Sequence, residues 1–178
     1  DPDKVGEDEA WYENRDYALK INVPFPWESP ASGIEDGSYL GTAWYERNLN
    51  LDDSWFAEGE QIFLKFGAVD WFCTLYVNGE KVGDHEGGYT PFEFNITDYV
   101  QAGDNKITLE VNDEASYGKD EYPALVGKQG HNAPCGYTHT SGIWQTVYLG
   151  GRSSTYMDYA HANPDTDNST VQFDLKVQ

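Results

Sequence analysis

Short segments in which apolar and polar residues alternate follow one another along the middle of the chain, and they constrain the fold more than any other feature. One side of residues 71–77 collects Trp71, Cys73, Leu75 and Val77, as alternate positions of a strand do. Asn78-Gly79 follows directly, and this dipeptide is typical of the two-residue turn of a β-hairpin. The sequence therefore predicts an antiparallel return through 80–86, with His85 at a sheet edge or on a sheet surface.

Similar segments recur at short spacing on both sides of this hairpin. Further strands are predicted at 44–51, 61–69, from Phe92 onward, 106–113, 143–149 and 170–177. Gly, Asn and Asp punctuate them, and the only helix-like turns expected lie in 52–60 and 95–100. Regularly spaced short strands indicate an all-β fold, an antiparallel β-sandwich. We interpret residues 1–178 as a single domain, with 1–10 and 151–178 as flanking parts.

Two stretches interrupt this pattern. Residues 22–39 contain Pro24, Pro26 and Pro30, so they are not expected to form a central strand. Residues 114–140 form a long loop rich in Tyr, Gly and His. Loops longer than about 12–15 residues in compact domains are usually functional or disordered, and this composition favours an ordered, functional loop.

The charge excludes two classes of partner. The formal net charge is −20, from 31 acidic and 11 basic residues, whereas a protein that binds phosphates needs a positive surface. Nucleic acid and membrane are therefore not expected as partners. No apolar run approaches the ~18 residues of a membrane helix.

Catalytic and metal motifs are weak. Thr140-Ser141-Gly142 is not a nucleophile elbow, and with 31 acidic residues a carboxylate pair carries little information. No histidine spacing predicts zinc. A structural calcium stays an open alternative for the acidic stretches 1–3 and 165–167. Cys73 is expected to be a buried free thiol, although a bridge to Cys135 is not excluded by the sequence.

Sugar binding is the chemistry that the loops favour. Aromatic rings and neighbouring polar groups suit the faces and the hydroxyls of sugars. Such residues gather in 114–140 and recur at Trp27-Glu28. We expect stacking by Trp27 and Tyr137. Polar contacts are expected from Glu28, Lys128, Gln129 and His139.

Five segments together resemble the sugar-binding domain of family 2 glycoside hydrolases. They are VPFPWESPASGI (23–34), WYER (44–47), FGAVDWFCTLYVNGEKVGDHEGGYTPFEFNIT (66–97), GKQG (127–130) and TSGIWQTVYL (140–149). The resemblance implies a galactose-binding-like jelly roll that precedes immunoglobulin-like and barrel domains. In that family the catalytic glutamates lie on the barrel, so no catalytic residue is assigned here.

The resemblance implies a non-catalytic carbohydrate-binding module whose partners are a glycan and the other domains of a parent polypeptide. The family's β-galactosidases place a sugar- and sodium-binding aspartate shortly before the SGI segment. This chain has Cys135-Gly136-Tyr137 there, so that contact is not transferred. An alternative from a different class is an architectural domain that docks on a catalytic barrel and binds no sugar. Hydrolysis of glycosides by this chain alone is the least supported of the three functional hypotheses.

Overall fold

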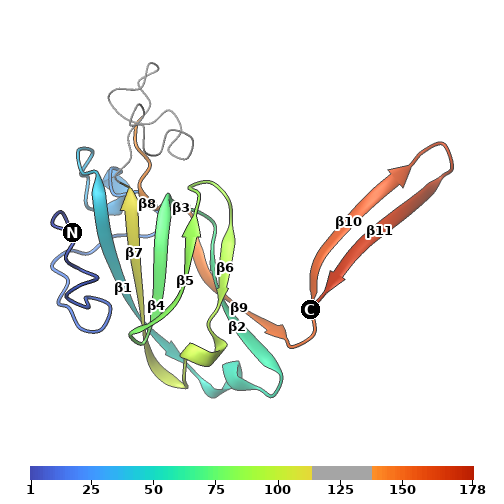
Figure 1. The fold of residues 1–178 in the computed structure, drawn as a ribbon, viewed down its shortest axis with the longest axis horizontal. Helices are drawn as coiled ribbons and strands as arrows, with labels where there is room; N and C mark the ends of the chain where they lie inside the picture. The colour runs from blue at the N-terminus through green and yellow to red at the C-terminus, as the bar shows by residue number, and fades with distance from the viewer. Residues whose placement is uncertain (114–137) are drawn as a thin grey trace.

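Two antiparallel sheets form the body of the computed structural model, which describes residues 1–113 and 138–178 (Figure 1). One sheet has the order β1–β7–β4–β5, and the other has the order β6–β2–β9. Their bounds are β1 Gly41–Leu51, β2 Glu60–Phe66, β4 Phe72–Val77, β5 Glu80–Glu86, β6 Phe92–Asn95, β7 Gly103–Asp113 and β9 Val147–Ser153. The short strands β3 (Val69–Asp70) and β8 (Gly142–Ile143) pair with each other. The predicted antiparallel sandwich is confirmed.

The core lies between the two sheets and follows the alternation in the sequence. Its buried members on β2, β4 and β7 are Ile62, Leu64, Phe66, Cys73, Leu75, Val77, Ile107, Leu109 and Val111. Every second residue of these strands therefore points inward, as the pleat requires. Cys73 is a free thiol with an exposed fraction of 0%, and burial raises its pKa to about 12. The prediction of a buried free cysteine is confirmed, while Cys135 lies outside the described residues.

The predicted hairpin is present between β4 and β5. Asn78 and Gly79 have φ angles of 52° and 86°, the left-handed values that a type I′ turn needs. The Asn78 amide side chain also donates to the Tyr99 carbonyl at 2.8 Å, which fixes the turn to the end of η3 (Thr97–Tyr99). In the β1–β7–β4–β5 order, β5 is an edge strand, and His85 on it stacks on Phe92 at 3.6 Å between ring centroids. His85 thus belongs to the sheet edge, as expected.

The proline-rich stretch forms no strand, as predicted. It contains the 3₁₀ helix η1 (Pro30–Ser32), whose first turn is capped by the Ser29 hydroxyl accepting from the Ala31 amide at 3.2 Å. The helical turns η2 (Asp53–Phe56) and η3 fall in the two stretches where the sequence allowed short turns.

A second hairpin, β10 (Met157–Asp165) with β11 (Thr170–Val177), projects away from the sandwich (Figure 1). The sequence predicted β11 but not β10. All residues of both strands are exposed, including the large apolar side chains Met157, Tyr159, Val171, Phe173, Leu175 and Val177. These apolar side chains therefore bury no surface against the sandwich.

Candidate functional site

Three carboxylates from distant parts of the chain interact at one end of the sandwich, which we call the loop end. Asp70 comes from β3, Asp113 ends β7, and Glu28 follows the buried Trp27. β3, β8 and the end of β7 all lie at this end of the sandwich, the end away from the base of the projecting hairpin (Figure 1). Asp70 and Asp113 are each only 1% exposed, so the loop end contains two buried carboxyl groups.

Ser141 ties Glu28 to the strand β8. Its backbone amide donates to Glu28 Oε2 at 3.1 Å, and its hydroxyl donates to Oε1 of the same carboxylate. The Trp27 amide in turn donates to the Ser141 carbonyl at 3.4 Å. The two carboxylate oxygens of Glu28 therefore help to hold residues 27 and 28 against Ser141. The sequence did not predict this structural role.

Asp113 is a buried carboxyl group in unfavourable surroundings. Its Oδ2 atom is buried and has no hydrogen-bond partner among the described residues. Its pKa is raised to about 7, mainly by burial. A hydrogen bond with Ser141 lowers this pKa, and the charges of Asp70 and Glu28 raise it. Asp113 therefore titrates near neutral pH.

Trp27 lies in the core, contrary to the stacking role expected from the sequence. Its side chain is 4% exposed, meets Tyr39 edge-on at 5.7 Å and donates from Nε1 to the Tyr39 carbonyl at 3.4 Å. A ring this buried has no open face for a sugar, because the neighbouring core side chains already cover it. We therefore assign Trp27 to the hydrophobic core.

The other predicted contacts divide into two groups. Glu28 is half-buried, and His139 is buried with 9% exposure. Both lie at the loop end because residues 139–141 lead into β8. Lys128, Gln129 and Tyr137 fall outside the described residues. Their role in binding stays a prediction.

An aromatic pair at the loop end was missed by the sequence reasoning. Tyr89 is 57% exposed and meets Trp144 edge-on with ring centroids 5.8 Å apart. Trp144 donates from Nε1 to the Gly88 carbonyl at 2.8 Å, which fixes its indole beside the turn. The adjacent residue Gly88 lies against Asp70, since a Cβ there would come within 2.4 Å of Asp70 Oδ1. The pair therefore borders the buried carboxylates.

The metal alternative has little support in the structure. Within residues 1–113 and 138–178, no three His, Cys, Asp or Glu side chains are grouped so that they could hold a metal ion. In the 165–167 stretch, Asp165 Oδ1 instead accepts from the backbone amides of Asp167 and Asn168 at 3.0 and 3.1 Å.

Among the described residues, no helix has the length and apolar character needed to cross a membrane.

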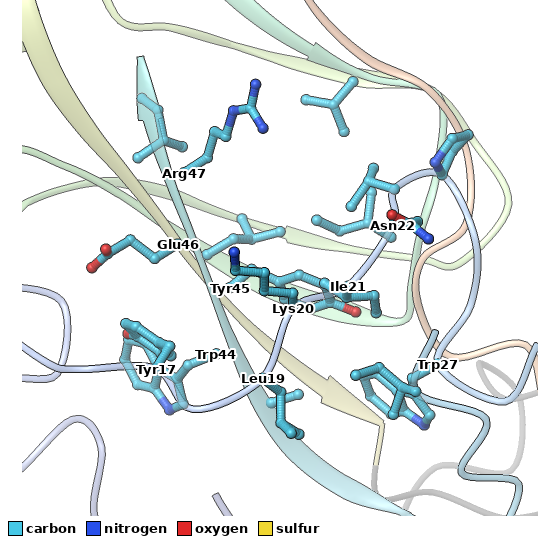
Figure 2. A pocket seen from close by; sticks show the side chains of 18 of the residues that line it. Tyr17, Leu19, Lys20, Ile21, Asn22, Trp27, Trp44, Tyr45, Glu46 and Arg47 are labelled. Atoms are coloured by element: carbon cyan, nitrogen blue, oxygen red, sulfur yellow. The ribbon is translucent and has the colours of Figure 1, made fainter. Parts of the chain in front are cut away.

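A groove of about 1570 Å³ lies between β1 and β9, away from the aromatic pair. Figure 2 shows residues 19–22 beside Tyr45, Glu46 and Arg47 of β1, with Trp27 at one end. Its floor includes core side chains of both sheets, namely Leu64, Phe66, Ile107 and Leu109. Residues 15–24 also line the groove, and these floor side chains are at most 9% exposed.

Gly142 is needed where β8 passes the core. Its φ is +82°, and a Cβ there would lie 2.1 Å from the Tyr45 hydroxyl oxygen and 2.9 Å from Trp27 Cε3. We expect Gly142→Ala to lower the free energy of unfolding by about 2 kcal/mol, because it adds both backbone strain and a clash.

Chemical denaturation measures this change in stability. Gly37→Ala is the matched control, since a Cβ at Gly37 has nothing within 4 Å. Equal stability of the two variants would contradict the close packing of β8 on Trp27 and Tyr45.

Comparisons with known proteins agree with this architecture. The family model for "Glycosyl hydrolases family 2, sugar binding domain" matches residues 2–151. A beta-galactosidase of Thermoanaerobacter pseudethanolicus is 32% identical over 120 residues, which is 67% of this chain and 15% of that protein. A beta-glucuronidase of Canis lupus familiaris is 26% identical over 192 aligned residues, 98% of this chain and 30% of that protein.

A solved structure shows the same fold. The beta-glucuronidase of an uncultured Clostridium species superposes with a TM-score of 0.76 at 24% identity, covering 98% of this chain and 30% of that one. The chain thus spans between 15% and 30% of the length of these relatives. The family match ends at residue 151, before the projecting hairpin begins at Met157.

Proposed function

The chain belongs to the sugar-binding domain family of the family 2 glycosyl hydrolases, and from this premise we propose that it is a non-catalytic module that binds carbohydrate at its loop end. The mechanism is stacking of a sugar on an exposed aromatic ring, with hydrogen bonds from neighbouring polar groups. No bond is broken in this proposal.

The pair of exposed Tyr89 and half-buried Trp144 carries the proposal. A sugar ring has apolar C–H faces that pack on aromatic rings, and Tyr and Trp add a polar group at the rim of the contact. The hydrogen bond from Trp144 Nε1 to the Gly88 carbonyl holds the indole in place, so little side-chain freedom is lost on binding. Tyr89, with 57% exposure, offers the larger open surface.

The polar part of the site comes from Glu28, His139 and the loop that joins β7 to β8. Glu28 keeps acceptor capacity beyond its two hydrogen bonds with Ser141, because a carboxylate has about four lone-pair directions. Lys128, Gln129 and Tyr137 are proposed as further contacts from the sequence alone. The sequence-based site is thus kept, with Tyr89 and Trp144 replacing Trp27 as the stacking residues.

The parent polypeptide is proposed to be a glycoside hydrolase. This follows from relatives named beta-galactosidase and beta-glucuronidase, which are at least three times as long as the aligned region. The two names differ in their sugar, so the proposal stops at carbohydrate as a class. We expect the 178-residue chain to release no product from aryl glycosides.

Affinity measurements against a panel of oligosaccharides test the site. For any glycan that binds, Tyr89→Ala is expected to weaken binding about tenfold, the equivalent of about 1.4 kcal/mol of stacking. Tyr148→Ala is the matched control, since Tyr148 is 55% exposed but lies on β9. Equal losses in the two variants, or none, would exclude the loop end as the site.

Two observations favour the architectural alternative. The predicted site residues Trp27 and His139 are buried, and the projecting hairpin exposes apolar side chains that a neighbouring domain can cover. Absence of binding to every glycan of the panel, by a chain whose fold is verified by its amide spectrum, would decide for this alternative.

A further inference from the structure

We propose that one face of the β10–β11 hairpin is an interaction surface for the part of the parent polypeptide that follows Gln178, and that the two form a second packed unit beside the sandwich. This surface requires the proposed parent polypeptide but not the glycan site, which lies at the loop end. The glycan site and the hairpin surface can therefore be tested separately.

Cross-strand pairing gathers the apolar side chains of the hairpin on one face. Phe173 stands opposite Ala162, and Leu175 stands opposite Ala160. Residues directly opposite each other in an antiparallel pair point to the same side of the sheet, and so do alternate residues of one strand. The apolar face of the hairpin therefore includes Ala160, Ala162, Val171, Phe173, Leu175 and Val177.

The opposite face of the hairpin is polar, and its side chains pair with one another. Asn163 donates from Nδ2 to Asp174 Oδ2 at 2.9 Å, and Gln172 donates from Nε2 to Asp174 Oδ1 at 3.0 Å. Near the base of the hairpin, Lys176 forms an ion pair with Asp158 at 2.6 Å. Antiparallel sheets commonly bury one face and expose the other to water. The polar face suits water, so the apolar face is the one to be covered.

The base of the hairpin is fixed to the sandwich. Tyr156 meets Phe63 of β2 edge-on, with ring centroids 6.0 Å apart. The guanidinium carbon of Arg152 lies 4.5 Å from the Phe63 centroid and 4.8 Å from the Tyr156 centroid, and Glu93 of β6 accepts two hydrogen bonds from Arg152. The hairpin therefore leaves the sandwich in a defined direction (Figure 1), with every residue of both strands exposed.

A hairpin of this kind needs a further layer. A two-stranded hairpin alone is at best marginally stable in water, and it becomes stable when more strands or a packed layer cover its apolar side. The sandwich does not supply that layer, because the residues of the apolar face are exposed. The layer must therefore come from another segment.

The chain beyond Gln178 is the segment that fits. The Gln178 amide donates to the Tyr156 carbonyl at 2.9 Å, and the Tyr156 amide donates to the Gln178 carbonyl at 3.3 Å, so a following residue would start at the base of the hairpin. A tethered segment acts at an effective concentration of about millimolar. This proximity favours it over a second copy of the chain.

The comparisons support the same occupant. The family match ends at residue 151, before the hairpin. The aligned regions of the Canis lupus familiaris protein and of the solved structure each include 98% of this chain, so they extend into the hairpin, but only 30% of either relative. The hairpin thus lies outside the sugar-binding domain and has counterparts in much longer proteins.

Thiol labelling on the two faces of β11 tests the proposal. Leu175→Cys places a thiol on the apolar face, and Gln172→Cys is the matched control on the polar face. Both positions are exposed, so a maleimide reagent should modify the two variants of the 178-residue chain at similar rates. In the full-length parent polypeptide, modification at position 175 should become at least ~tenfold slower, while the rate at position 172 should stay the same. Mass spectrometry of the labelled peptide separates the introduced thiol from Cys73 and Cys135.

Equal rates at the two positions in the parent polypeptide would overturn the proposal. So would slow modification of Leu175→Cys in the 178-residue chain that depends on its concentration, because a second copy would then cover the apolar face. Ala160→Cys, on β10, repeats the test if Leu175→Cys fails to fold. A gene product that ends at Gln178 would refute the parent polypeptide itself, whereas equal rates in a longer product would refute only the covered face.

Discussion

Asp113→Asn is expected to make the protein more stable than the wild type at pH 8 and to change its stability little at pH 4. In the folded chain the pKa of Asp113 is raised from 3.8 to about 7, mainly because the group is buried. Each pKa unit is worth about 1.4 kcal/mol, so the whole difference corresponds to about 4 kcal/mol. Asn carries no charge at any of these pH values.

The direction follows from proton linkage. Between about pH 4 and pH 7 the folded wild type holds a proton on Asp113 that the unfolded chain has released, so its stability falls as pH rises. Above pH 7 Asp113 is ionised in the folded protein, beside Asp70 and Glu28. The stability that its bound proton contributed at lower pH is then fully lost. Below pH 4 both states are protonated, and the wild type and the variant should be similar.

Denaturation curves of both proteins at several pH values measure the difference directly. Glu110, whose pKa burial also raises to about 7, contributes to both curves and cancels in the comparison. Asp98→Asn, at an exposed position, controls for the change in net charge. A stability difference that does not grow between pH 4 and pH 7 would contradict the buried position of Asp113.

The parts of the fold that depend on local sequence were predictable. The hairpin at Asn78-Gly79 was recognised because two adjacent residues with positive φ determine a type I′ turn. β2, β4 and β7 were recognised because one face of each is buried, which imposes period-2 alternation. All residues of both β10 and β11 are exposed, so burial does not separate them. β11 was recognised because Val171, Phe173, Leu175 and Val177 alternate with polar residues, whereas the β10 segment has no such apolar alternation and contains Pro164.

The site depended on contacts between distant residues and was predicted less well. Trp27 looked available for stacking in a proline-rich loop, yet its environment is decided by Tyr39 and the core. Tyr89 and Trp144 are 55 positions apart, and only the fold brings their rings to 5.8 Å. A weak signal was present in GGY and SGIW, two Gly-containing motifs that each carry an aromatic.

Leu75→Ala is expected to lower the free energy of unfolding by about 2–5 kcal/mol, because it leaves a cavity in the centre of the sandwich. Leu75 is 0% exposed, on β4 between β5 and β7. For a domain of this size the melting temperature should fall by roughly 5–15 °C, which calorimetry or circular dichroism can follow.

Leu175→Ala is the matched comparison, because it removes the same atoms from the projecting hairpin, where Leu175 is 56% exposed. Its effect should stay within about 0.5 kcal/mol. A large gap between the two variants means that the sandwich unfolds as a unit to which β11 contributes little. A comparable loss in Leu175→Ala would mean instead that the apolar side of the hairpin is covered in solution, and the hairpin would then belong to the cooperative core.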